Sequence, residues 1–338
     1  MSRVKRESRV TSVDVARRCG VSQSTVSLVL SGKAAGRVSD RTAAAVRSAA
    51  DELGYRPNAA ARALKTGAAR TVVLVVPDVT NPFFGAVLRG AQSAARDAGY
   101  AVALVDTAND RAYGTASAAA LQAGPADGLL LFAIDPPPPR RGTRAEPIVL
   151  IESDVGGHPG VRLDVEGGTA AAVQHLLDLG HRRIGHLASA IEGSTFWLRR
   201  RTLEALAGDA PSARADFVPE EARDAALALL GDHPELTAVF CDDDVLASGV
   251  YLAARRLGMR IPKELSVVGF DDLDVARVLD PPLTTVTADG RQLGRVAFEL
   301  LAAQMAGRKP ESRVLDVALT VRGSTTAPAH RAARLKSS

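Results

Sequence analysis

The chain has 338 residues, of which 46% are hydrophobic and only 4% aromatic. This length favours two domains, and this composition suits a sizeable α/β core built mainly from Ala, Val and Leu. No run approaches the ~18 apolar residues that cross a bilayer, and residues 1–9 lack the apolar stretch of a signal peptide. The composition therefore argues against a membrane protein or a membrane partner and predicts a protein that stays in the cytoplasm.

The formal net charge of +4 hides an uneven distribution along the chain. Residues 1–70 carry 14 Lys and Arg against 5 Asp and Glu, whereas residues 71–338 carry 28 against 33. A basic N-terminal part on an acidic body is typical of a protein in which only one part binds a polyphosphate such as DNA.

Cysteine and histidine spacing predicts no metal centre. Cys19 and Cys241 form neither a disulfide framework nor a metal-ligand pair, and each is expected to be a small buried hydrophobe. His175, His181 and His186 lie six and five residues apart, not the four of a helical zinc pair. We expect solvated or locally hydrogen-bonded histidines and no cofactor.

Residues 10–32 are predicted to form two short helices around a tight turn, which is the plan of a helix-turn-helix. Thr11 and Asp14 fit a capping box at the start of the first helix. Gly20 can take the left-handed conformation that ends a helix, and Ser22 can cap the second one.

The second helix has one apolar and one polar face. Its apolar face places Val26, Val29 and Leu30 at the i, i+3, i+4 spacing of a buried stripe. Short polar side chains on the opposite face can approach base edges in the major groove. For this segment alone, an ordinary helical hairpin with a polar exposed face is the alternative. The basic charge of residues 1–70 favours DNA binding over that alternative. The polar face consists of Gln23, Ser24, Thr25 and Ser27.

A third helix is expected from a cap at Ser39 to about Leu53, followed by a short helix at 58–66. A helix of about nine residues is marginal in water, so this one could form only when a partner helix and DNA complete its packing. A plain linker is the alternative, but it would not need Leu64 between its basic neighbours.

From Thr71 onward, short apolar runs alternate with amphipathic segments, which favours parallel strands covered by helices on both faces. The pattern is interrupted near Asp164 and then resumes, which indicates two similar lobes. Helices are expected at about 83–98, 112–122, 167–179, 198–207, 220–230, 245–257 and 292–305.

Six motifs follow one another along the chain from Val10 to about Pro328, namely DVARRCGVSQSTVS, ELGYRPNAAARALKTG, VVPDVTNPFF, LGHRRIGHL, SVVGFDD and PPLTTV. Together, and in this order, they resemble the LacI/GalR type of transcriptional regulator. The resemblance implies a dimeric, operator-binding repressor or activator with a two-lobed, periplasmic-binding-protein-like body, whose chain crosses three times between the lobes around a ligand cleft.

The expected domains follow from this resemblance. The absence of leucine heptads near the C-terminus favours a homodimer over a tetramer. The parts are an all-α helix-turn-helix headpiece at 1–57, a hinge helix and linker at 58–70, an effector-binding and dimerisation domain at 71–328, and a disordered basic tail at 329–338. Within that domain the first lobe is expected at about 71–164 and 289–312, and the second at about 165–288 and 313–328.

The resemblance also implies a set of DNA-binding residues. The family's arginine after the TVS motif is Leu28 here, and a leucine offers only apolar contact where an arginine can read guanine. Leu64 matches a leucine that wedges into the minor groove. The set is Thr11, Ser22, Gln23, Ser24, Thr25, Ser27, Leu28, Arg37, Tyr55, Asn58, Arg62, Leu64 and Lys65.

Effector-binding residues are implied on both sides of the cleft. Carboxylates with an arginine suit vicinal hydroxyls, and Phe84 or Trp197 could stack on a sugar face, so a sugar or nucleoside is expected. Each residue could instead make a lobe–lobe or capping contact. The set is Asn81 and Phe84 in the first lobe, and Asp164, Trp197, Arg199, Asp243 and Asp271 on the other side.

Two departures from the family pattern concern this cleft. The usual Ala-Asn-Asp is Asp242-Asp243-Asp244, which adds negative charge and would suit an amine-bearing or hydroxyl-rich ligand. The usual Arg-x-x-Gly-Phe is 199–203, RRRTL, which leaves two registers for the arginine.

An enzyme is the main alternative function. Asp242 and Asp244 follow an apolar run, and carboxylates after parallel strands can hold Mg²⁺ for phosphoryl transfer. Their spacing resembles that of haloacid-dehalogenase-type phosphatases, but Leu246 stands where those enzymes have Thr or Val. Since Walker A, GxGxxG and GxSxG motifs are also absent, a non-enzyme is expected.

A periplasmic sugar receptor is a third possibility, because it would share the two-lobed body. The basic N-terminal part and the missing signal peptide argue against it. Secretion of the protein would decide in its favour.

Overall fold

The computed structural model describes residues 10–55, 69–110, 126–132, 147–153 and 157–329, with the isolated positions 112 and 116. It divides between Ala69 and Arg70 into two compact units. Each unit is described by itself below.

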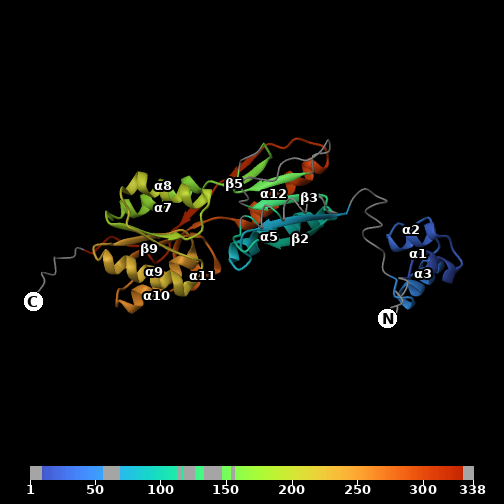
Figure 1. Ribbon diagram of the computed structural model, residues 1–338, viewed down its shortest axis with the longest axis horizontal. Coiled ribbons are helices and arrows are strands. Elements are labelled where there is room, and N and C mark those ends of the chain that lie inside the picture. The colour runs from blue at the N-terminus through green and yellow to red at the C-terminus, as the bar shows by residue number, and fades with distance from the viewer. Residues whose placement is uncertain are drawn as a thin grey trace, which may run out of the picture. The chain divides into compact units, whose positions relative to one another are not determined.

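Between residues 10 and 55, the N-terminal unit contains three helices, α1 (Ser12–Cys19), α2 (Gln23–Leu30) and α3 (Asp40–Glu52) (Figure 1). The backbone amide and the hydroxyl of Thr11 donate to Asp14 Oδ2 at 2.9 and 2.7 Å, and Gly20 has φ 64°. The predicted start and end of α1 are therefore confirmed. A small core holds the helices together through Val15, Ala16, Val26, Val29, Ala34, Ala43, Val46, Ala49 and Ala50.

The second unit has two lobes, each built on a six-stranded sheet. In the first lobe the order is β11-β5-β4-β3-β1-β2, and in the second it is β12-β10-β9-β8-β6-β7. The first sheet comprises β1 (Thr71–Val76), β2 (Ala101–Asp106), β3 (Gly128–Phe132), β4 (Ile148–Ile151), β5 (Gly160–Leu163) and β11 (Arg313–Leu315). The second comprises β6 (Ile184–Ser189), β7 (Ser212–Ala215), β8 (Ala238–Cys241), β9 (Ser266–Asp271), β10 (Thr284–Thr287) and β12 (Ala318–Thr320).

Among the described strands, all pairs are parallel except β10 with β12. The residues of β3, β4, β6 and β8 are buried throughout, as expected for parallel strands covered on both faces. The predicted two-lobed α/β fold is confirmed.

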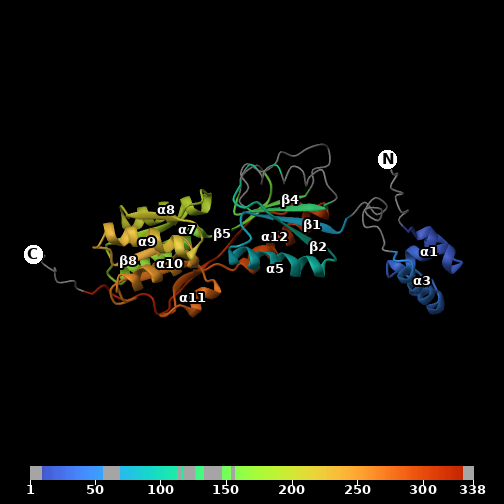
Figure 2. The ribbon, with the colours of Figure 1, turned by 60° about the horizontal axis from the view of Figure 1, so that its bottom comes forward.

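Helices α5 (Pro82–Asp97) and α12 (Gly290–Met305) pack closely in the first lobe (Figure 2). A Cβ on Gly294 would lie 1.9 Å from the carbonyl oxygen of Val87, and one on Gly90 would lie 2.0 Å from that of Arg291. Glycine is therefore required at both positions for the two backbones to approach.

The second lobe carries its helices on both sides of the sheet, with α7 and α8 on one side and α9 and α10 on the other (Figure 1). Their bounds are α7 (Val165–Asp178), α8 (Ser194–Ala207), α9 (Pro219–Asp232), α10 (Asp244–Arg256) and the short α11 (Asp274–Val278). The sequence did not predict α11 or β7, which are only five and four residues long. The helix expected at 112–122 lies outside the described residues except at positions 112 and 116.

The chain passes between the lobes after β5, after β10 and after β11. The last crossing differs from the expected boundary at 312, because Arg313–Leu315 pairs in parallel with β5 of the first sheet. The segment 313–320 thus contains two short strands that belong to different sheets. Among the described helices, none has the length and apolar character needed to span a membrane.

Candidate functional site

Helix α2 presents the small polar face that the sequence predicted. Val26 and Val29 are buried in the core of the N-terminal unit, while Gln23, Ser24 and Ser27 are exposed. Gln23 Nε2 donates to Ser12 Oγ at 2.9 Å, so the start of α2 is tied to α1. The chain thus holds an exposed hydrogen-bonding surface on a rigid helix.

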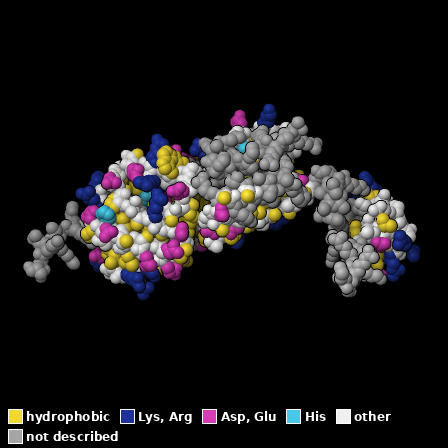
Figure 3. Space-filling model, in the orientation of Figure 1, with side chains coloured by type: hydrophobic (Ala, Val, Ile, Leu, Met, Phe, Trp, Pro, Cys, Tyr) yellow, Lys and Arg dark blue, Asp and Glu magenta, His cyan; other side chains and the backbone are white. Residues whose placement is uncertain are grey.

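The residues flanking this face have structural roles as well. Ser22 Oγ accepts from the Thr25 amide at 3.1 Å and caps α2, whose half-buried Leu28 follows. Thr11 caps α1, Arg37 is exposed, and Tyr55 packs against the core of the unit. Lys and Arg side chains project from this unit on the face drawn in Figure 3. The predicted contacts Asn58, Arg62, Leu64 and Lys65 lie outside the described residues.

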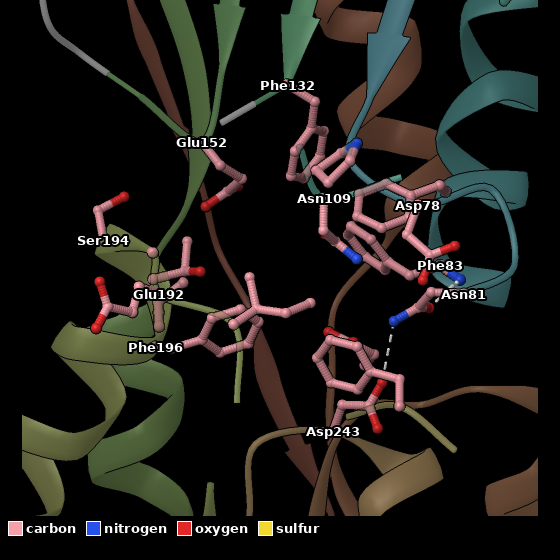
Figure 4. Close-up of a pocket in the computed structure, with 18 of the residues that line it drawn as sticks. Asp78, Asn81, Phe83, Asn109, Phe132, Glu152, Glu192, Ser194, Phe196 and Asp243 are labelled. Atoms are coloured by element: carbon pink, nitrogen blue, oxygen red, sulfur yellow. Dashed lines mark hydrogen bonds between the residues drawn. The ribbon is translucent and has the colours of Figure 1, made fainter. Parts of the chain in front are cut away.

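A cavity of about 170 Å³ lies between the two lobes of the second unit (Figure 4). Its lining residues lie at strand ends and helix starts of both lobes, which is the position where open α/β folds bind ligands. Five of the seven predicted effector residues line it, namely Asn81, Phe84, Arg199, Asp243 and Asp271.

The structure does not place the other two predicted residues in the cavity. Asp164 is exposed and caps α7 by accepting from the Gly167 amide at 3.0 Å. Trp197 is 58% exposed and lies under the Arg201 guanidinium, 5.2 Å from the ring centroid. Because one residue turns about 100° around a helix, its neighbour Phe196 faces the cavity instead.

Asn81 and Asp243 meet across the cavity. Asn81 Nδ2 donates to Asp243 Oδ2 at 3.2 Å, and both side chains are buried (dashed line in Figure 4). Asp243 Oδ1 also accepts the amides of Val245 and Leu246 at 2.6 and 2.9 Å, which caps α10. Burial, together with the nearby Asp271, raises the pKa of Asp243 to about 7, although the helix amides oppose the shift.

Arg199 is the arginine that faces the cavity, and Arg200 is instead paired with Glu204 at the surface. Its guanidinium donates to the Asp242 carbonyl, lies 3.8 Å from the Phe270 ring centroid and comes within 3.8 Å of Asp271 Oδ1. Of the two registers that the sequence left open for this arginine, the one that uses Arg199 therefore applies in this structure.

Glu152 is a cavity residue that the sequence analysis did not single out. It follows β4 with φ 57°, is only 6% exposed, and accepts the Leu163 amide at 2.8 Å through Oε1. Burial raises its pKa to about 7. The signal was present as a carboxylate directly after the apolar run PIVLI.

The carboxylates of the candidate Mg²⁺ site are directed to separate protein donors. Asp242 accepts from His186 Nε2 at 2.9 Å and from the Ser189 amide at 2.8 Å. Asp244 accepts from Thr285 Oγ1 and the Leu273 amide, both at 2.6 Å. Within the part of the chain that the structure describes, no three His, Cys, Asp or Glu residues are grouped to hold a metal ion.

The three histidines are hydrogen-bonded, as the sequence allowed. His175 Nε2 lies 2.9 Å from Thr325 Oγ1, and the buried His181 lies 2.8 Å from Thr237 Oγ1. Burial lowers the pKa of both. His186 is buried against Asp242 and is not solvated.

Family comparisons match both units. Residues 12–58 match the family described as bacterial regulatory proteins, lacI family, and residues 173–325 match a periplasmic binding protein-like domain. The chain is 33% identical to the HTH-type transcriptional repressor CytR of Escherichia coli K12, over 97% of this chain and 99% of that protein. It is 31% identical to the repressor PurR of Pectobacterium atrosepticum, over 90% and 93% respectively.

Solved structures show the same similarity. The lac repressor dimer bound to operator and the anti-inducer ONPF is 25% identical, with a TM-score of 0.82 over 95% of this chain and 100% of that one. A transcriptional regulator CelR–cellobiose complex is 28% identical, with a TM-score of 0.65 over 94% and 100%.

Proposed function

The chain belongs to the LacI family of bacterial regulatory proteins, and on this premise we propose that it is a repressor whose homodimer binds a pseudo-palindromic operator under the control of a small polar effector. The observation that carries this proposal is α2, a capped helix with an exposed polar face in a strongly basic unit. Such a helix suits the major groove.

A homodimer is supported by the likeness to a lac repressor that was solved as a dimer on its operator. Two identical headpieces related by a twofold axis require two inverted half-sites. We therefore expect the homodimer to bind DNA with a single half-site only weakly.

A sugar or nucleoside is the proposed effector class. The interlobe cavity combines aromatic walls with carboxyl groups and one guanidinium, which can stack on a ring and orient its hydroxyls. The CelR relative was solved with cellobiose, which supports a polar ligand in this type of domain. A thermal-shift screen of sugars and nucleosides tests this, since a ligand at 100 times its Kd stabilises by about 2.7 kcal/mol.

A mobility-shift assay over genomic fragments at low salt tests DNA binding. The expected result is retention of a few fragments, with an affinity that falls steeply as salt rises, because each neutralised phosphate contributes a slope of about −0.9 in log K against log salt. Failure to retain any fragment, or equal retention of all of them, would reject a sequence-specific regulator.

A further inference from the structure

The walls of the interlobe cavity are unusually aromatic for this chain. The whole sequence has eight phenylalanines, and five of them line this one cavity. Phe84 and Phe132 contact edge to face, with ring centroids 4.8 Å apart. The five are Phe83, Phe84, Phe132, Phe196 and Phe217, and Figure 4 shows the labelled ones on both sides of the space.

The charged groups of the cavity are strongly unbalanced. Among the described residues that line it, six carry a carboxyl group and Arg199 alone carries a positive charge. That guanidinium donates through Nη1 to the Asp242 carbonyl and packs on the Phe270 ring, while its buried Nε has no hydrogen-bond partner in the described part of the chain. The six are Asp78, Asp110, Glu152, Glu192, Asp243 and Asp271.

Two of these carboxyl groups, those of the buried Glu152 and the largely buried Asp271, have unused acceptor capacity. Glu152 uses Oε1 for the Leu163 amide, while its other oxygen meets no donor in the described part of the chain. The Asp271 carboxylate has one polar contact with a side chain among those residues, that with Arg199 at 3.8 Å. Figure 4 draws Glu152 directed toward the cavity, so this oxygen is available to a ligand.

We propose that the effector is a cation, a small molecule with a protonated amino group on a ring-bearing frame, held by Glu152 and Asp271. This inference rests on the proposed function of the cavity and narrows its ligand. A buried carboxylate is costly unless it is paired, and an ammonium group supplies both the charge and the donors. Phenylalanine faces add cation–π attraction, and an anionic ligand would be repelled.

The electrostatics of these two carboxyl groups also suit a cationic ligand. Burial raises the pKa of Glu152 to about 7 and that of Asp271 to about 6, although Arg199 opposes both shifts. A bound ammonium group would lower both pKa values and release protons.

Three probes with the same ring but different charges test whether the cavity selects a cation. Benzylamine, benzyl alcohol and benzoate carry the same ring with a positive, a neutral and a negative group, and their binding to the full chain can be measured by calorimetry at pH 8. We expect benzylamine to bind at least tenfold more tightly than benzyl alcohol, and benzoate to bind most weakly. Glu152→Gln, which keeps an oxygen for the Leu163 amide, should abolish the preference for the amine.

Asp274→Asn is the matched control, because it removes a carboxylate from the exposed surface. It should keep the full preference. The inference is overturned if the alcohol or benzoate matches the amine, if Glu152→Gln keeps the preference, if the control loses it, or if none of the probes binds at millimolar concentration. A neutral sugar that binds while benzylamine does not would overturn this inference and leave the proposed regulatory function intact.

Discussion

Asn81 Nδ2 of the first lobe lies 3.2 Å from Asp243 Oδ2 of the second, and this hydrogen bond joins the N-terminal caps of two helices across the cavity. Asn81 Oδ1 accepts the Phe83 amide at the start of α5, and Asp243 Oδ1 accepts two amides at the start of α10. Each side chain is therefore fixed in its own lobe. The bond between them stabilises the lobe arrangement seen here.

Asn81→Ala should loosen this arrangement. It leaves one oxygen of the buried Asp243 without its donor, a loss of about 1–3 kcal/mol in the free energy of unfolding. It should also broaden the distribution of interlobe distances, measured by fluorescence resonance energy transfer between labels on the two lobes.

Asp289→Ala is the control for this experiment, because Asp289 caps α12 by accepting from Gln292 and makes no such bond across the cavity. Losing that cap should cost about 1 kcal/mol and leave the interlobe distances unchanged. Equal distributions for Asn81→Ala and the parent protein would show that the bond does not hold the lobes.

The buried Glu152 makes stability depend on pH in a predictable direction. Its pKa is 4.5 when unfolded and about 7 in the fold, so the folded protein binds more protons between these values. The contribution that Glu152 makes to the free energy of unfolding below pH 4.5 is therefore lost as the pH rises through 7. Glu152→Gln cannot ionise, so it should melt at a higher temperature than the parent at pH 8 and at a similar temperature at pH 4.5. A melting difference independent of pH would contradict this.

Local features were readable from the sequence, and positions set by long-range packing were not. The caps at Thr11, Ser22 and Ser39 were predicted correctly because each involves residues three positions apart. Glu152 stands directly after an apolar strand, which indicates a carboxylate at the strand end, but the backbone turn to φ 57° at this residue could not be read from the sequence.

The family resemblance supplied what local patterns could not. It pointed to Arg199 and Asp271, which are 72 positions apart in the sequence and both line the cavity. It also pointed to Trp197, which does not line the cavity, because motif matching fixes a helix but not which of two adjacent aromatic residues faces inward. The exposed Trp197 and the lining Phe196 differ by one position on α8.

Leu28 is expected to set the DNA sequence preference. It is half-buried in α2 among exposed polar neighbours, at a position where the LacI/GalR pattern has an arginine. The arginine of the Leu28→Arg variant can read guanine through two hydrogen bonds. These discriminate against a wrong base by about 1–3 kcal/mol of binding free energy. Random-site selection with this variant should yield a changed base at one symmetric pair of positions. An unchanged selected sequence would show that residue 28 does not face the bases.

Random-site selection with the unmodified full chain, followed by native mass spectrometry of the complex, tests the central claim most directly. We expect the enriched sequence to be an inverted repeat bound by two copies of the chain, because twofold-related α2 helices read two half-sites. Enrichment of no sequence, or of a single half-site bound by one copy, would contradict it.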